Sequence, residues 1–318
     1  MSSRFWLYAG IVTAGTVTVA YALAVTELPA IGASALLHPA RRPVTIPAPD
    51  GCVTRTLAAG DMTLTGWTCD GRVPWRGTLV YLHGVADNRE SGIGIIKRFV
   101  PRGLTVVAYD SRAHGDSKGE ACTYGYFEQA DLHRILDTVA APIVLVGNSL
   151  GAAVALQEAA HDSRVAAIVA IAPFADLRTI ATERAPFVFT HGIIERAFAR
   201  AEADAHFHVD VVSPVMAARE VTAAVLLVHG AADVDTPPAH SVRIASALAG
   251  PAQLMIVPEL RHNDPLPAPV WDDIERWVIE HVSPTRGRPA STRGQPVPTR
   301  ADPSRLVADP RRLVPTRP

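Results

Sequence analysis

The stretch from Pro142 to Gly151 constrains the fold of this chain more than any other. Its β-branched run, Ile143 to Val146, predicts a strand buried on both faces, and the alanine-rich sequence from Ala152 to Ala160 predicts a helix. Between them lies G-N-S-L-G, residues 147–151. In a strand–turn–helix context this pattern predicts a nucleophile elbow, in which the serine sits on a strained turn above the sheet edge. The alternative is an ordinary strand-to-helix turn with a serine between two glycines.

An oxyanion hole is predicted from two backbone amides near Ser149. The first is the amide of Leu150, the residue that follows the serine in the elbow. The second is that of Val85, because the apolar strand expected over residues 78–82 runs directly into the loop His83-Gly84-Val85. An HG dipeptide alone is a weak signal, and its position one strand pair before the elbow gives it weight.

The acid and base of a catalytic triad follow in the order Ser, Asp, His. Asp233 comes after an expected strand at residues 224–228, and His262 follows one at residues 253–257, so both lie at the carboxyl edge of the sheet. His262 would take the proton of Ser149, while the carboxylate would hold the tautomer of the imidazole. Asp235 precedes Thr236-Pro237 at a helix start, where capping explains it. His114 precedes the nucleophile and is predicted to be structural.

Length and composition are those of one large α/β domain, expected over residues 50–282. The chain has 318 residues, of which 48% are hydrophobic, enough for a full core. Strands and helices alternate until residues 177–213, which have no strand-like run and predict a small helical lid. The apolar residues of this lid either line an acyl pocket or pack the lid onto the body.

The N-terminal segment, residues 1–26, is predicted to lie outside the hydrophobic core of the domain. Phe5 to Val25 is uncharged, apolar and long enough to cross a bilayer as a helix. An uncleaved membrane anchor with the catalytic domain outside the cytoplasm is therefore expected, since Arg4 precedes the run. A cleaved signal peptide, which would give a secreted protein, remains the alternative. Residues 27–49, rich in Pro and Ala, are expected to be a linker.

A hairpin is predicted near the start of the domain, because two alternating segments flank Gly60-Asp61. Cys52 and Cys69 lie at its open end, where a disulfide would join them. Two unpaired buried thiols are the alternative.

Net charge, the histidines and the C-terminal segment indicate which binding partners and cofactors to expect. The net charge of −1 gives no reason to expect nucleic acid. His206-Phe207-His208 has no carboxylate or cysteine constellation around it, so neither a metal nor any other cofactor is predicted. Residues 283–318, dominated by Pro, Arg, Ser and Thr, predict a disordered tail, either solvated or bound to an anionic surface.

Taken together, these motifs resemble the α/β-hydrolase superfamily. The resemblance rests on G-N-S-L-G, the HG loop, D-S-R-A-H-G-D-S, H-G-A-A-D-V-D-T-P and R-H-N-D, and it covers residues 36–282. Three further segments make it similar to membrane-anchored bacterial ABHD-type esterases: Leu37-His38-Pro39-Ala40-Arg41-Arg42-Pro43, the Leu64-Thr65-Gly66-Trp67 strand and Cys122-Thr123-Tyr124-Gly125. Two residues depart from the family pattern. Ala113 stands where the family usually has the glycine of an R-G-H-G loop, and Arg261 stands beside the base, where a small residue is common. Because Arg261 is charged, we expect the mouth of the pocket to be more polar than is usual in the family.

The resemblance implies an α/β-hydrolase fold, a mostly parallel doubly wound sheet, with Ser149 as nucleophile, Asp233 as acid and His262 as base. The expected function is hydrolysis of a small-molecule carboxylic ester or thioester through an acyl-enzyme. An amidase or peptidase with the same triad is an alternative. A non-catalytic binding protein of the same fold is a further alternative. Loss of a triad residue or of an elbow glycine would favour it, but this sequence retains all of them.

Overall fold

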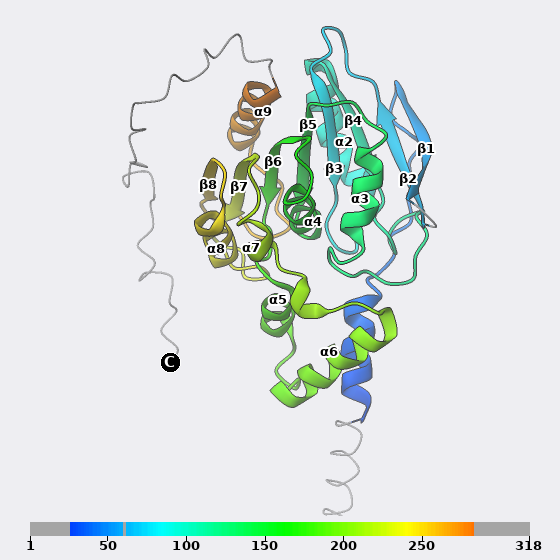
Figure 1. Ribbon diagram of the computed structural model, residues 1–318, viewed down its shortest axis with the longest axis vertical. Coiled ribbons are helices and arrows are strands. Elements are labelled where there is room, and N and C mark those ends of the chain that lie inside the picture. Colours follow the sequence, from blue (N-terminus) through cyan, green and yellow to red (C-terminus); the bar gives the residue numbers. More distant parts are fainter. Residues whose placement is uncertain (1–25, 60–61, 283–318) are drawn as a thin grey trace, which may run out of the picture. The chain divides into compact units, whose positions relative to one another are not determined.

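An eight-stranded sheet forms the centre of the protein (Figure 1). The structure is a computed structural model that describes residues 26–59 and 62–282. The order of the strands across the sheet is β1-β2-β4-β3-β5-β6-β7-β8. Their bounds are β1 Cys52–Ala59, β2 Met62–Cys69, β3 Gly77–Leu82, β4 Leu104–Tyr109, β5 Ile143–Asn148, β6 Val165–Ile171, β7 Ala224–Gly230 and β8 Ala252–Val257.

Only β2 runs against the rest of the sheet. It pairs antiparallel with β1 and with β4, whereas the ladders from β4 to β8 are all parallel. Strands β3 and β5 are buried almost throughout, as their continuous apolar runs predict for strands covered on both faces. Because parallel strands end at the same edge, the loops that follow β3, β5, β7 and β8 meet at one edge of the sheet.

Helices cover both faces of the sheet. On one face, α2 (Ile93–Phe99) and α9 (Ala268–Val282) pack against it through side chains that include Phe99, Ile274 and Trp277. On the other face lie α3 (Glu128–Leu136), α4 (Leu150–Ala159), the short α7 (Pro214–Ala217) and α8 (Ala239–Ala247). The structure therefore has the doubly wound architecture that the sequence predicts.

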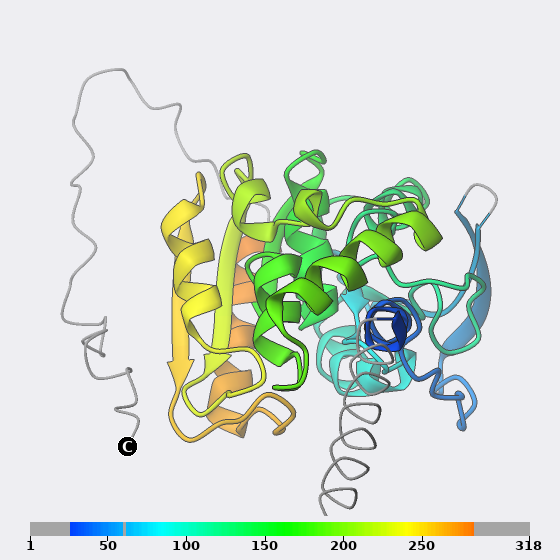
Figure 2. The ribbon, with the colours of Figure 1, turned by 90° about the horizontal axis from the view of Figure 1, so that it is seen from below.

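A third, smaller apolar cluster joins the lid to the start of the described chain. Between β6 and β7 lie α5 (Leu177–Arg184) and α6 (His191–Ala205). Residues 26–37 are also helical, where a linker was expected, and this N-terminal helix packs against the same cluster through Ala33 and Leu37. Figures 1 and 2 show it beside α6 at one end of the sheet. The helix forms because its apolar residues have the lid as a surface against which to be buried.

The predicted hairpin and its disulfide are both present. Strands β1 and β2 pair in a register that places Cys52 directly opposite Cys69, and the two residues form a disulfide. Cys122 is free and buried. The prediction of a disulfide is thus confirmed over the alternative of two unpaired thiols.

The predicted membrane-anchored localisation must be corrected. Across residues 26–59 and 62–282, the structure has no helix of sufficient length and apolar character to cross a membrane. The run from Phe5 to Val25, on which the expectation rested, lies outside the described residues, as does the tail expected over residues 283–318.

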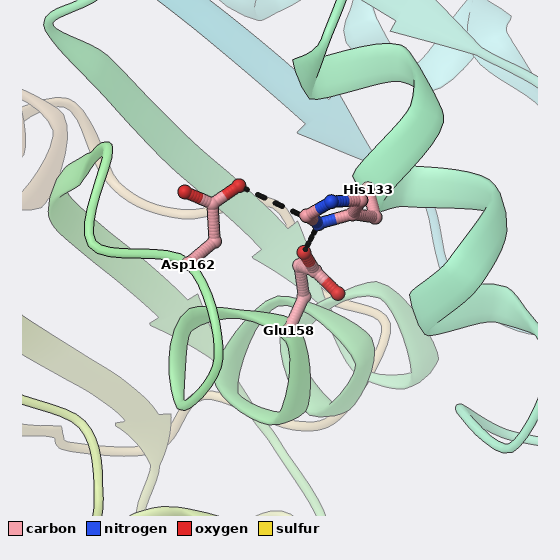
Figure 3. A group of neighbouring side chains, drawn as sticks. All are labelled: His133, Glu158 and Asp162. Atoms are coloured by element: carbon pink, nitrogen blue, oxygen red, sulfur yellow. Dashed lines mark hydrogen bonds and ion pairs between the residues drawn. The ribbon is translucent and has the colours of Figure 1, made fainter.

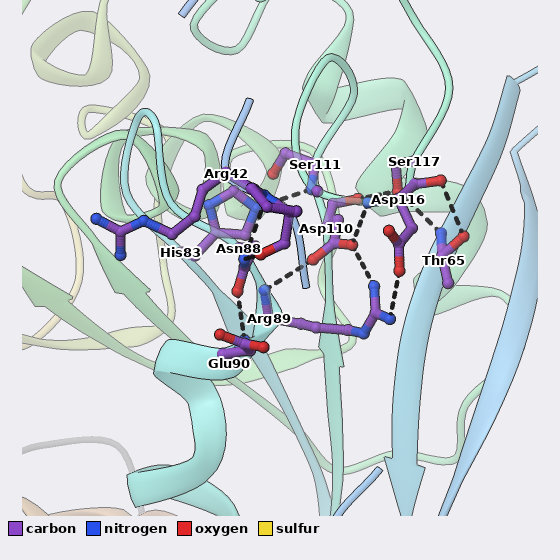
Figure 4. Close-up of polar contacts among 12 residues, drawn as sticks. Arg42, Thr65, His83, Asn88, Arg89, Glu90, Asp110, Ser111, Asp116 and Ser117 are labelled. Carbon is purple, nitrogen blue, oxygen red and sulfur yellow. Dashed lines mark hydrogen bonds and ion pairs between the residues drawn. The ribbon is translucent and has the colours of Figure 1, made fainter. Parts of the chain in front are cut away.

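A buried ion pair joins the loops after β3 and β4 (Figure 4). The guanidinium of Arg89 contacts the carboxylate of Asp110, and their side chains are 5% and 0% exposed. Asp110 also accepts hydrogen bonds from the amides of Arg89 at 2.7 Å and Asp116 at 2.8 Å. Gly115, at φ +46°, passes so close that a Cβ there would lie 2.2 Å from the Asp110 carboxylate. Asp110, Gly115 and Asp116 of the D-S-R-A-H-G-D-S motif therefore have structural roles around this ion pair.

Asp110→Asn should lower the free energy of unfolding by about 3–5 kcal/mol, because it leaves the buried Arg89 charge without its main counterion. Asp87→Asn is the matched control. Asp87 pairs with Arg42 at 3.3 Å, with side chains 22% and 64% exposed, so its loss should cost less than about 1 kcal/mol. Equilibrium unfolding in urea measures both values. Equal losses in the two variants would contradict the structural role given to Asp110.

Candidate active site

Ser149 lies on a strained turn between β5 and α4. Its φ and ψ are 49° and −109°, a conformation that non-glycine residues rarely adopt. The two flanking glycines are required by close backbone contacts. A Cβ on Gly147 would lie 2.4 Å from the amide nitrogen of Ala152, and one on Gly151 would lie 2.2 Å from the carbonyl oxygen of Leu82. The G-x-S-x-G pattern therefore forms the tight elbow that the sequence predicts, rather than an ordinary turn.

The three predicted triad residues lie within hydrogen-bond distance of one another. The Nε2 atom of His262 is 3.0 Å from the Oγ of Ser149, and its Nδ1 is 2.7 Å from Oδ2 of Asp233. A carboxylate only accepts hydrogen bonds, so Nδ1 carries the proton and Nε2 offers its lone pair to the serine hydroxyl. This is the tautomer that a general base needs.

Asp233 is held in its ionised form by its surroundings. Burial by itself would raise the pKa of this carboxyl, but hydrogen bonds from His229, His262 and the amide of Thr236 outweigh burial and hold the pKa below its usual value. His229 is 1% exposed and also contacts the carbonyl oxygen of Thr236 at 2.7 Å. The turn that carries Asp233 is thus fastened to the end of β7.

Asp235 occupies a different environment in the same loop. Its side chain is exposed, and its backbone amide donates to Oδ1 of Asp233 at 3.1 Å. The carboxylate of Asp233, in contrast, is fully buried beside His262. The geometry therefore favours Asp233 as the acid of the triad.

The two residues predicted to supply the amides of an oxyanion hole, Leu150 and Val85, both lie close to the cavities at Ser149. Leu150 is the first residue of α4, so its N–H is one of the free donors at a helix N-terminus. Val85 follows the HG loop and lines the same cavities as Ser149. A developing negative charge on a substrate oxygen would be stabilised by the N–H of Leu150 at this helix N-terminus.

The histidine of the HG loop holds that loop in place. His83 is fully buried, and its Nε2 accepts a hydrogen bond from the amide of Ser111 at 3.0 Å. Burial, with the neighbouring ring of His114, lowers the pKa of His83 to about 4. His114 is itself buried, and its Nδ1 donates to the carbonyl oxygen of Arg112 at 2.8 Å. It thus has the structural environment that the sequence analysis expects.

Arg184 is a site residue that sequence reasoning missed. It ends α5, and its guanidinium donates at 2.7 Å to both the carbonyl oxygen of Asp235 and the hydroxyl of Thr236. One of its nitrogens also lies 3.4 Å from Nε2 of His262. Nothing in the sequence around Arg184 indicates this position, because the contacts join the lid to a loop some fifty residues away in the chain.

Two cavities open at Ser149. One, of about 340 Å³, is lined predominantly by apolar side chains and lies under the lid. The other, of about 930 Å³, is lined by His262, Asp233 and a set of charged side chains. Val85, Ser149 and Arg184 line both. Arg261 lines the second, in agreement with the more polar pocket mouth expected from the sequence.

Away from this site, a histidine and two carboxylates approach one another at metal-ligand spacing (Figure 3). His133 donates from Nδ1 to Glu158 at 2.7 Å, and burial raises the pKa of Glu158 to about 7. Asp162 is already neutralised by Arg164, whose nitrogens lie 2.6–3.1 Å from its oxygens. Since each carboxylate has a charged or hydrogen-bonding partner in the chain, we interpret the group as an ion-pair network between α3, the end of α4 and the turn before β6.

A family model described as serine aminopeptidase, S33, matches residues 74–214. That segment includes the elbow and the HG loop but ends before Asp233 and His262. It also excludes the N-terminal helix.

Among curated relatives, an uncharacterised protein of Mycobacterium tuberculosis is 28% identical over 246 residues, covering 74% of this chain and 77% of that protein. A monoacylglycerol lipase of Mycolicibacterium smegmatis is 27% identical over 264 residues, covering 68% of this chain and 92% of that protein. Among solved structures, the Pyrococcus furiosus esterase Pf2001 superposes with a TM-score of 0.61 at 20% identity, over 77% of this chain and 97% of that one.

Proposed function

This chain has the α/β-hydrolase fold, and on that premise we propose that it is a serine hydrolase that cleaves carboxylic esters or thioesters through an acyl-enzyme. The observation that carries the proposal is the alignment of Ser149, His262 and Asp233 at 3.0 and 2.7 Å on a strained elbow. The similarity to a lipase and to an esterase supports the same class of reaction.

In the first half-reaction, the Oγ of Ser149 attacks the acyl carbon and forms a bond to it, while its proton passes to Nε2 of His262. The oxygen of the former carbonyl takes up negative charge and is stabilised by the amides of Leu150 and Val85. The bond to the leaving group then breaks, and His262 returns the proton to that group. Asp233, already ionised, stabilises the imidazolium that exists between these steps.

In the second half-reaction, water replaces the leaving group. His262 removes a proton from the water, whose oxygen bonds to the acyl carbon, and the acid is released as Oγ of Ser149 recovers its proton. No step requires a cofactor.

Amide or peptide hydrolysis is the second candidate, because the matching family model is described as a serine aminopeptidase. The same triad would perform it, with an amine as the leaving group. The polar cavity beside His262 would then hold the amine side of the substrate.

The purified protein should hydrolyse p-nitrophenyl esters and the matched thioesters, and a fluorophosphonate should block that turnover. A series with the same acyl group as ester, thioester and p-nitroanilide separates the candidates by kcat/KM. A preference for the anilide would favour the amidase. Absence of turnover on all three, together with absence of fluorophosphonate labelling, would overturn the proposal and favour a non-catalytic binding protein.

A further inference from the structure

We propose that the N-terminal helix, residues 26–37, is part of the acyl-binding site, so that it limits the length of the acyl chain that the enzyme accepts. The substrate would be an ester or thioester of an apolar, short to medium-length acyl group with a large polar leaving group. The inference rests on the proposed function and deepens it. The two cavities that meet at Ser149 differ in polarity: apolar side chains line most of one, and charged side chains line much of the other.

The position of His262 decides which cavity receives the leaving group. The general acid must protonate the departing atom, so the leaving group has to lie on the side of the serine where the imidazole is. His262 and Asp233 line the polar cavity and not the apolar one. The polar cavity of about 930 Å³ is also lined by charged side chains, among them Arg42, Asp87 and Arg261. The leaving group therefore occupies the polar cavity.

The acyl group would then bind in the apolar cavity. Half of its lining residues come from the two lid helices and the segment that joins them, with side chains such as Ile180, Phe189 and Phe198. Such a surface offers an acyl chain burial worth about 0.8 kcal/mol for each methylene. At about 340 Å³ the cavity lies near the lower end of the range for ligand sites, so it fits a short to medium-length acyl chain better than a long one.

The N-terminal helix forms one wall of this cavity through Ile31, Gly32, Ala35 and Leu36. Its packing on the lid is close: a Cβ on Gly32 would lie 2.8 Å from the ring of Phe189 and 3.0 Å from the Cβ of Ala197. The hydroxyl of Tyr124 donates to the carbonyl oxygen of Leu36 at 3.1 Å and so ties the helix to the body. This wall lies outside residues 74–214, to which the family model is matched.

Two substitutions on the helix change the wall in opposite directions. Ala35→Leu adds bulk at the cavity and should lower kcat/KM for a p-nitrophenyl decanoate by about tenfold, with the acetate ester unaffected. Leu36→Ala removes bulk and should raise the ratio of decanoate to acetate activity. Ser34→Leu is the matched control: it adds the same side chain at an exposed position on the same helix that lines neither cavity, so both activities should stay unchanged.

A binding readout separates this inference from the proposed function. In the Ser149→Ala background, which performs no acyl transfer to the serine, isothermal titration with methyl decanoate should give a Kd about tenfold higher when Ala35→Leu is added. An unchanged Kd and an unchanged chain-length profile in Ala35→Leu would overturn the role of the helix even if the enzyme is an esterase. If the Kd rises but the native protein cleaves no ester, the acyl site stands and the proposed reaction is wrong.

Discussion

Ser149→Ala should lower kcat for ester hydrolysis by about 10⁶-fold, the largest effect we expect from any single substitution. The reason is that the attacking oxygen is lost, and the neighbouring His262 then has no hydroxyl to deprotonate. The elbow itself should persist, because its geometry depends on the close approach at Gly147 and Gly151 and not on the serine side chain. Steady-state hydrolysis of a p-nitrophenyl ester measures the loss, with circular dichroism to verify the fold.

Ser246→Ala is the control for that experiment. Its hydroxyl lies on α8 and bonds to the carbonyl oxygen of Val242 at 2.9 Å, on an exposed surface, so full activity is expected. Retention of full activity in Ser149→Ala would mean that any hydrolysis proceeds without this serine, and the proposed mechanism would fail.

The second large effect concerns the acid. Asp233→Asn should lower kcat by about 10⁴-fold, since an amide in place of the carboxylate favours the tautomer of His262 that cannot accept the serine proton. The 2.7 Å contact between Asp233 and Nδ1 of His262 is the one that the substitution alters. Asp235→Asn, a substitution of the same kind two residues away, should change kcat only slightly because that side chain is exposed.

The relative order of these two variants is the informative result. If Asp235→Asn were the crippling change and Asp233→Asn the mild one, the assignment of Asp233 as the acid would be wrong.

The geometry of the proposed triad was largely predictable from local sequence patterns. An elbow needs a strand, two small residues around a serine and a helix, and all of these are contiguous in residues 142–160. Asp233 and His262 were placed by the rule that parallel strands end at one edge, which does not depend on details of packing. The disulfide followed similarly from the two ends of a hairpin.

The walls of the site were not predictable in the same way. Arg184 meets Thr236 and His262 through tertiary contacts that no local pattern encodes. The sequence predicts a linker over residues 27–49, because Pro and Ala dominate that segment. The surface that stabilises the helix formed by its first part lies on α6, far along the chain. The membrane anchor was inferred from hydropathy alone, and no helix in residues 26–59 and 62–282 is long and apolar enough to supply it.

The central claim is that Ser149 carries the acyl group between the two half-reactions. The most direct test is mass spectrometry of the full-length protein after reaction with a fluorophosphonate, followed by mapping of the modified peptide. The account predicts one adduct per chain, located on Ser149, and loss of ester hydrolysis in proportion to labelling. An adduct on another residue, or full hydrolysis by protein fully labelled on Ser149, would contradict it.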